Sequence, residues 1–396
     1  MSIKFATGFE HPLLFTSGSA SLTFGDLNVM FNDHLKHIRY HIGTTGTVDV
    51  PNITAYAAGT AAIHRQTYFH TKHNGYNSNG VGSAFRYFIG SHTHNILVMK
   101  KEKFTDGFYV NMWWCANTRS VSSPYDVVYA FTTGTKTYGV ALKSDLTAGV
   151  YLCIRNMTPG EETNYVVATE PSWTLSTPVG PSNTTLSLDN TGVVTASFNG
   201  VTVSYDISSV TGETSFTQWD EFGVATNPDR GNIDDIIVCD GAGTEYNTVP
   251  PSVKIPFVYE AQTYESSVNT TASDGGTVLD VLTDKDNSTS AVITPFPGNI
   301  RMVIPPLSGI FPPGEANDVA GVIAVATKMY DTYTTQPGKQ VAASVKVSGT
   351  TSDGETLTIP TTPGDVSLFT TRYSAAAPWS VAALNNGNFH IQLDVT

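Results

Sequence analysis

Two groups of side chains in this sequence have the types and spacing to hold a metal ion. The first is His92-Thr93-His94, where two imidazoles stand two residues apart. In an extended strand, residues i and i+2 lie on the same face, so this pair could bind a transition metal. No cysteine stands nearby to complete a ligand set. Ordinary packing is therefore the interpretation that we favour for His92 and His94.

The second group is acidic. Asp234 and Asp235 stand at the mouth of an expected strand, and Asp240 follows on the turn after it. Carboxylate oxygens are the ligands that Ca²⁺ prefers, although the spacing is not that of an EF-hand loop. The alternative is that one carboxylate caps a turn through its own backbone while the other is solvated. We expect no cofactor, with Ca²⁺ at these three residues as the alternative.

Aromatic residues gather in the segment Tyr109–Cys115. Trp113 and Trp114 are adjacent, and neighbouring residues of a strand point to opposite faces. One indole should therefore enter the core while the other faces outward. An exposed indole near Tyr109 would suit sugar stacking or a protein contact. We take Tyr109, Trp113 and Trp114 as candidate contacts for a glycan or a partner, with core packing as the alternative.

The sequence contains no strong catalytic motif. Carboxylate pairs occur at Glu161-Glu162 and Asp220-Glu221, but adjacent residues of a strand cannot converge on one substrate atom. The sequence holds no Gly-x-Ser-x-Gly elbow, no P-loop and no His-Glu-x-x-His. We predict that the chain is not an enzyme, with glycan depolymerase activity as a lesser alternative.

Composition narrows the class of protein. The 396 residues carry a formal charge of −13, and only 14% of them are charged. Phosphate binding needs clustered Lys and Arg, and the only such cluster is Lys100-Lys101 with Lys103, so we expect no nucleic-acid partner. No stretch approaches the roughly 18 apolar residues of a membrane span, and the start lacks a basic segment followed by an apolar one. We expect no membrane insertion.

The elements that must position these residues are strands. Abundant Gly, Thr, Ser and Asn, with few charged residues, favour an all-β protein. The pair Asn199-Gly200 between two alternating runs predicts a hairpin over 193–206. We expect a turn-rich excursion over 156–185 with one strand inside it, and a short helix near 26–35. The other expected strands are 84–89, 96–100, 108–116, 126–131, 138–143, 150–155 and 165–168.

The length predicts two domains. Pro250-Pro251 cannot supply ladder hydrogen bonds, which places the boundary there. The predicted division is a first domain over 1–246, a proline-containing linker over 247–258 and a second domain over 259–396. The three cysteines are far apart and lie in apolar strand patterns, so we expect buried thiols and no disulfide framework.

Several segments together resemble tailed-bacteriophage virion proteins with a concanavalin-like, laminin-G-like domain. The order of the pieces matches that family. The matching segments are Thr7-Gly8-Phe9-Glu10, residues 80–87, residues 103–110, residues 149–155 and Ile233-Asp234-Asp235-Ile236. Residues 377–385 around Trp379 resemble part of a companion domain.

The resemblance implies an N-terminal concanavalin-like (jelly-roll) β-sandwich followed by a smaller β-sandwich domain. It also implies a structural protein on the exterior of the virion, made in the host cytoplasm. Its partners would be other virion proteins, further copies of itself (a trimer by analogy) and host-surface polysaccharide. Within that class we expect a tail fibre or appendage that contributes to host attachment. The alternative is a head, neck or tail decoration protein with a purely structural role.

Overall fold

The computed structural model describes the strands, the two short helices and the turns joined to them. The described residues are 3–7, 35–41, 47–50, 61–64, 84–87, 94–99, 107–115, 125–133, 136–145, 149–158, 164–170, 182–198, 200–211, 221–226, 232–241, 247–250, 252, 263–283, 291–294, 297–304, 318–319, 322–326, 339–347, 350–358, 368–372, 379–380 and 389–396.

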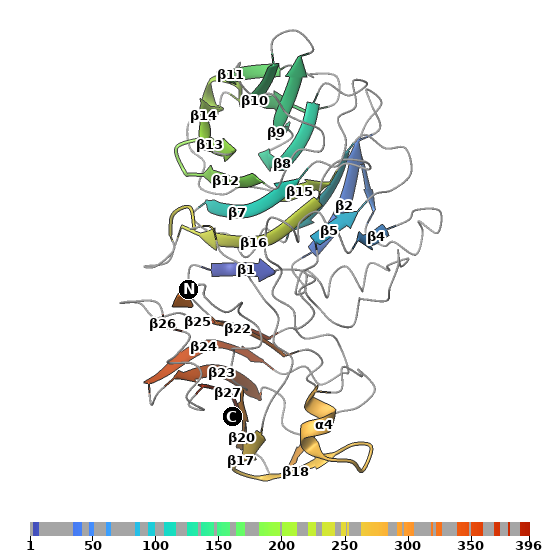
Figure 1. Cartoon of the computed structure of the whole chain (residues 1–396), viewed down its shortest axis with the longest axis vertical. Helices are drawn as coiled ribbons and strands as arrows, with labels where there is room; N and C mark the ends of the chain where they lie inside the picture. The colour runs from blue at the N-terminus through green and yellow to red at the C-terminus, as the bar shows by residue number, and fades with distance from the viewer. Residues whose placement is uncertain are drawn as a thin grey trace. The chain divides into compact units, whose positions relative to one another are not determined.

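The fold is all-β, as the composition predicts (Figure 1). The chain divides into two compact units. The first reaches to Ile255, and Pro256–Thr396 forms nearly all of the second. In the described part of the chain, no helix is long and apolar enough to cross a membrane.

The first unit contains two eight-stranded antiparallel sheets. Sheet A has the order β14-β13-β12-β7-β16-β5-β4, and β1 also pairs with β16. Its strands are β1 (Ile3–Thr7), β4 (Ala61–His64), β5 (Ala84–Tyr87), β7 (Phe108–Cys115), β12 (Ser182–Leu188), β13 (Val193–Phe198), β14 (Val201–Asp206) and β16 (Asn232–Asp240).

Sheet B has the order β11-β10-β9-β8-β15-β6-β2-β3. Its strands are β2 (Leu35–His41), β3 (Thr47–Val50), β6 (His94–Met99), β8 (Tyr125–Thr133), β9 (Lys136–Asp145), β10 (Gly149–Asn156), β11 (Asn164–Glu170) and β15 (Glu221–Thr226).

The inner faces of the two sheets form the core of the first unit. From sheet A, alternate residues such as Val110, Met112 and Trp114 are fully buried. From sheet B, the Tyr129 hydroxyl donates a hydrogen bond of 3.0 Å to the carbonyl of Thr184 on β12, which ties the two sheets together. Burial raises the pKa of Tyr129 far above its ordinary 10.0, so this donor stays protonated.

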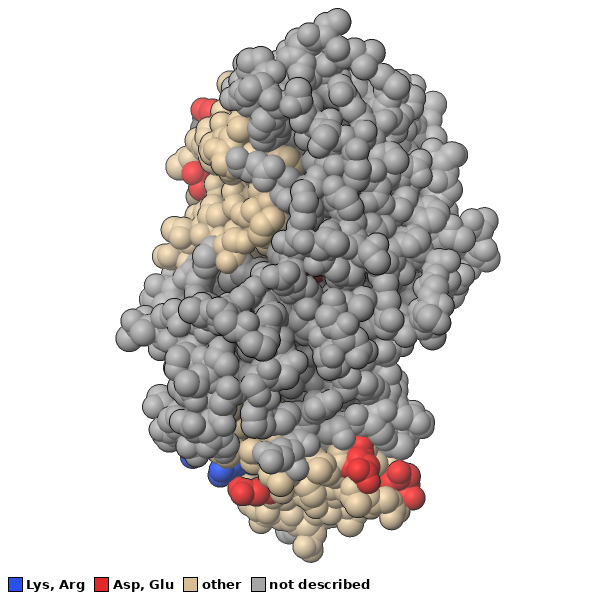
Figure 2. Space-filling view, viewed as in Figure 1, with Lys and Arg blue, Asp and Glu red and all other residues tan. Residues whose placement is uncertain are grey.

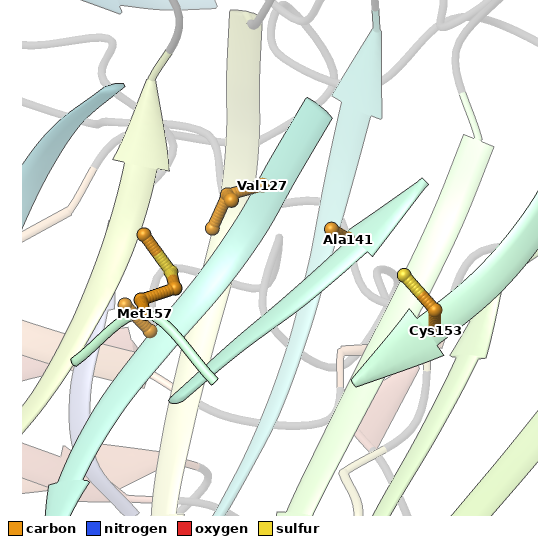
Figure 3. Packing of buried hydrophobic residues seen from close by; sticks show 5 residues of the cluster. Val127, Ala141, Cys153 and Met157 are labelled. Atoms are coloured by element: carbon orange, nitrogen blue, oxygen red, sulfur yellow. The ribbon is translucent and has the colours of Figure 1, made fainter. Parts of the chain in front are cut away.

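The outer face of the β8–β10 part of sheet B carries a second apolar cluster of small residues. It consists of Val127, Ala130, Ala141, Cys153 and Met157, all buried (Figure 3). Met157 follows β10 and folds back, with its N–H donating to the Thr137 carbonyl at 2.7 Å. Its sulfur then covers Gly139, where a Cβ would overlap it. Sheet B is therefore packed on both faces around these strands.

Strand β16 changes neighbours at a β-bulge. Before the bulge Ile233 pairs with β5, and after it Ile236–Cys239 pairs with β1. Asp235 and Ile236 together oppose the single residue Met112 of β7. Asp235 has a φ of 46°, the left-handed conformation that the first residue of one bulge type adopts. The bulge lets two short strands share one edge of β16.

The second unit is built on a five-stranded antiparallel sheet, sheet C. Its order is β17-β20-β27-β23-β24, and three two-stranded ladders accompany it. The strands of sheet C are β17 (Thr263–Ser266), β20 (Gly298–Val303), β23 (Gln340–Val347), β24 (Thr350–Thr358) and β27 (Phe389–Val395). The ladders are β18 (Asn269–Ala272) with β19 (Ala291–Thr294), β21 (Asp318–Val319) with β26 (Trp379–Ser380), and β22 (Val322–Ala326) with β25 (Leu368–Arg372).

The structure corrects the sequence prediction at strand β12 and adds two short helices that were not predicted. Strand β12 begins at Ser182, inside the segment predicted as a surface excursion. Helix α4 (Val278–Thr283) was not predicted, and the Thr277 hydroxyl accepts a hydrogen bond of 3.1 Å from the Asp280 N–H at its start. The expected helix near 26–35 lies outside the described residues except Leu35, which begins β2. A second short helix, α3 (Ser208–Thr211), follows β14.

Two of the three cysteines match the prediction. Cys153 and Cys239 are free and buried. Burial raises the pKa of the Cys239 thiol, and the neighbouring Asp240 carboxylate adds to the increase. The side chain of Cys115 lies outside the described residues.

Candidate functional site

The outer face of sheet A presents an ordered array of hydroxyl and amide groups. On β7, β12, β13 and β14, the residues between the core positions point away from sheet B. The pairing registers align eight of them in two rows across the strands. The first row is Asn111, Thr185, Ser197 and Thr202, and the second is Tyr109, Ser187, Thr195 and Ser204. We call these eight residues the hydroxyl face.

The rows have regular spacing because they follow the sheet. Neighbouring strands lie about 4.8 Å apart, and residues i and i+2 of one strand lie roughly 6.7 Å apart. Within the second row, the side-chain oxygens of Thr195 and Ser204 are 2.9 Å apart and share a hydrogen bond. Hydroxyls both donate and accept. The array can therefore meet a ligand whose own hydroxyls repeat at similar intervals.

The hydroxyl face becomes more exposed toward the edge of the sheet. Thr202 and Ser204 on β14 are exposed, whereas Thr195 and Ser197 on β13 are half-buried. Asp206 ends β14 on the same side and is also exposed. The hydroxyl and N–H of Ser208 bind its carboxylate and lower the pKa of Asp206 below its ordinary value. Asp206 is therefore a fixed negative charge beside the rows.

The two tryptophans of β7 lie on opposite faces of sheet A, as the alternation predicts. Trp114 is only 1% exposed and packs edge-on against Phe198, with ring centroids 5.6 Å apart. Its inclusion among the candidate contacts is therefore wrong, because a ring that fills the core cannot meet a surface ligand. Trp113 and Tyr109 lie on the outer side and are half-buried.

Two asparagines on the outer side of sheet A hold the segment that follows β16. Asn111 is only 3% exposed, and its side-chain amide donates to the Pro250 carbonyl at 2.9 Å. The side-chain amide of Asn183 donates to the side-chain oxygen Oδ1 of Asn111 at 2.6 Å and to the Ser252 hydroxyl at 3.2 Å. We call Asn111 and Asn183 the asparagine clasp.

The clasp changes the interpretation of the outer aromatic residues. Asn111 stands between Tyr109 and Trp113 on the same side of β7. The chain segment that Asn111 binds therefore lies beside the rings that the sequence suggests as a sugar platform. Local patterns could not reveal this contact, because Asn111 and Pro250 are 139 residues apart in sequence.

The three aspartates proposed for calcium are buried. Asp234 and Asp235 are 7% and 8% exposed and lie inside β16, not at its mouth. The Asp234 carboxylate accepts the Asp235 N–H at 2.8 Å, which supports the left-handed residue of the bulge. The alternative interpretation expected one carboxylate to bind nearby backbone, as Asp234 does, but it did not expect both residues to be buried. Asp240 is the last residue of β16 and is 0% exposed.

In the described part of the chain, these aspartates belong to no group of three potential metal-binding side chains. Among the residues that the structure describes, no three His, Cys, Asp or Glu side chains lie close enough to hold a metal ion together. His92 lies outside the described residues. His94 begins β6, where only its backbone is described, as the register partner of His41 on β2.

A charged cluster lies on one face of sheet C in the second unit. Arg301 on β20 approaches Glu265 at 3.4 Å and donates to Nε2 of His390 at 2.9 Å. Burial and the Arg301 charge lower the pKa of His390 below 6.5; Lys346 lowers it further, and Glu265 opposes the shift. His390 is 7% exposed and is therefore held neutral near pH 7.

This cluster predicts that the second unit loses stability in mild acid. The pKa of His390 is lower in the folded state than the value of about 6.5 in the unfolded chain, so below about pH 6.5 the unfolded chain binds this proton more readily. The contribution of His390 to the free energy of unfolding is therefore fully present above about pH 6.5 and declines as the pH falls below it. Native-state hydrogen exchange of the β27 peptide at pH 7.5 and 5.5 measures the effect. His390→Gln should show a smaller decline than the unsubstituted chain, and equal declines in the two proteins would contradict the prediction.

Neither a protein-family model nor a curated protein matches the sequence. Solved structures resemble parts of the fold. Domain 4 of a GH43 extracellular arabinanase from Geobacillus stearothermophilus, in complex with arabinotriose, is 15% identical, with a TM-score of 0.28 over 46% of this chain and 75% of that chain. An alginate lyase from Pseudomonas aeruginosa is 9% identical, with a TM-score of 0.31 over 52% of this chain and 98% of that chain.

A third similar structure comes from a phage. The CBM2 module of the evolved Dit of Lactobacillus casei BL23 phage J-1 is 11% identical, with a TM-score of 0.29 over 52% of this chain and 96% of that chain. All three likenesses concern the fold.

Proposed function

We propose that this chain is a non-enzymatic structural protein on the exterior of a tailed-phage particle, and that its first unit attaches to host-surface glycan through the hydroxyl face. The observation that carries the attachment is the pair of hydroxyl rows across β7, β12, β13 and β14. The placement on a virion rests on the order of the sequence segments that resemble such proteins. No cofactor enters the proposal.

Glycan recognition follows from the chemistry of the rows. A sugar ring presents hydroxyls that both donate and accept, and Thr and Ser side chains can satisfy either role. The exposed end at Thr202 and Ser204 gives a ligand access. Binding without cleavage suits this face, because it gathers neutral groups and not a nucleophile with a base.

Removing the exposed hydroxyls tests the attachment. The double variant Thr202→Val/Ser204→Ala should bind a host-surface polysaccharide about tenfold more weakly, since each lost hydrogen bond is worth about 0.5–1.5 kcal/mol. Glycan-array binding of the purified chain measures this. The matched control is Thr356→Val/Thr358→Ala, two exposed threonines of the edge strand β24. Equal losses in both variants, or no glycan bound by the unsubstituted chain, would refute the attachment.

A decoration role without glycan binding is the second candidate. The observation in its favour is the asparagine clasp, which places a segment of the chain itself beside Tyr109 and Trp113. In either role the chain would assemble as a homo-oligomer with other virion proteins. Gold-labelled antibodies on intact particles separate the roles: label at the tail tip supports attachment, and label over the head or tail tube supports decoration.

A further inference from the structure

We infer that the hydroxyl face selects an uncharged, extended polysaccharide and rejects acidic ones. This inference rests on the proposed attachment function and names the class of glycan. Its basis is the charge of the face and the direction in which the two rows run.

The face lacks cationic side chains. Strands β7, β12, β13, β14 and β16 contain no Lys, Arg or His. The described surface around β12–β14 accordingly shows red and tan but no blue in the view of Figure 2. An acidic sugar is normally held by Arg or Lys, which supply charge-assisted hydrogen bonds to its carboxylate. Such a ligand would find no counter-charge on these strands.

The charge that borders the rows is negative. Asp206 lies two residues beyond Ser204 on the same side of β14, and the hydrogen bonds from Ser208 lower the pKa of its carboxyl. A carboxylate on a ligand lying along the second row would approach Asp206 and be repelled. Like-charge juxtaposition is a recognised way to exclude a wrong partner. Asp189, in the turn between β12 and β13, is a second carboxylate near these strands, and it accepts hydrogen bonds from Thr191 and Val193.

The rows also indicate the shape of the ligand. Each row crosses four strands, so its side chains repeat at about 4.8 Å along a nearly straight line. This repeat is close to the length that one pyranose ring adds to an extended chain. A neutral polysaccharide lying across the strands would meet one hydroxyl from each of β12, β13 and β14 in turn.

Matched pairs of neutral and acidic polymers test the inference. Affinity electrophoresis of the full chain would use galactan against polygalacturonate, hydroxyethyl cellulose against carboxymethyl cellulose, and mannan against alginate. We expect at least one neutral polymer to bind, to lose binding in Thr202→Val/Ser204→Ala, and to bind at least tenfold more tightly than its acidic counterpart. Asp206→Asn should raise binding of the acidic member relative to the neutral one, because the repelling charge is gone while an acceptor for Ser208 remains.

The outcomes separate this inference from the proposed function. An acidic polymer that binds as tightly as its neutral counterpart, and that also depends on Thr202 and Ser204, would overturn the inference and leave the attachment function standing. If no polymer of either kind binds, the inference is overturned, and the glycan array on host polysaccharides decides the attachment function separately. Raising the salt concentration should narrow the difference within each pair, since it screens Asp206.

Discussion

Replacing Trp114 by alanine should lower the free energy of unfolding of the first unit by about 3–5 kcal/mol, the usual cost of removing a large aromatic from a core. Trp114 is 1% exposed and packs against Phe198 of β13, so the cavity would open in the core, on the inner face of sheet A. Urea unfolding followed by circular dichroism measures the loss. The hydroxyl face lies on the other side of these strands and would lose its support.

Trp113→Ala is the matched control, because the two residues are adjacent and identical in type. Trp113 lies on the outer side and is half-buried, so the loss should be less than half that of Trp114→Ala. Trp114→Phe should also lower the free energy of unfolding less than Trp114→Ala does. Among the described residues, the buried Trp114 indole N–H has no hydrogen-bond partner, so phenylalanine keeps most of the packing and removes an unsatisfied donor. Equal losses for the two alanine variants would contradict the assignment of Trp114 to the core.

Gly107→Ala should destabilise the first unit by about 3 kcal/mol, from two causes that add. Gly107 has a φ of +79°, where an L side chain is strained by about 1–2 kcal/mol. A Cβ there would also overlap the backbone carbonyl oxygen of Leu188 on β12, which cannot move without disturbing the ladder between β7 and β12. Thermal and urea unfolding measure the loss.

Gly200→Ala separates the two causes. Gly200 has a similar φ of +83° at the turn between β13 and β14, but a Cβ there would meet nothing within 4 Å. Gly200→Ala should lower the free energy of unfolding by about 1 kcal/mol, which is the conformational cost alone. If Gly107→Ala lowers the free energy of unfolding no more than Gly200→Ala does, the close approach of β7 to β12 at Leu188 does not constrain the fold.

Local patterns predicted the parts of the fold that depend on near neighbours. The hairpin at Asn199-Gly200 forms β13 and β14, because the turn conformation is decided by the residues within it. The opposite placement of Trp113 and Trp114 follows from the alternation of side chains along one strand. Strand β12 has the same alternation at Thr184, Leu186 and Leu188, so its signal was present and was hidden by the turn-forming residues before it.

The candidate site depends on features that local sequence patterns do not predict. The sequence analysis placed Asp234 and Asp235 at the mouth of a strand, but they are buried inside β16, and their burial depends on the neighbouring strands. The two hydroxyl rows exist only because four strands pair in one register, and a shift by one residue would turn every member toward the core. The hydroxyls themselves were visible in the sequence; their alignment was not.

The sequence by itself determined an all-β chain with a core of alternating apolar residues, because composition and period-two alternation are local properties. Only the tertiary structure decided which residues face one another. The registers that form the hydroxyl face, the bulge at Asp235 and the contact of Asn111 with Pro250 across 139 residues all join distant segments. The physical reason is that strand pairing and register depend on burying the apolar faces of all the strands of a sheet together. A short segment of sequence does not contain that information.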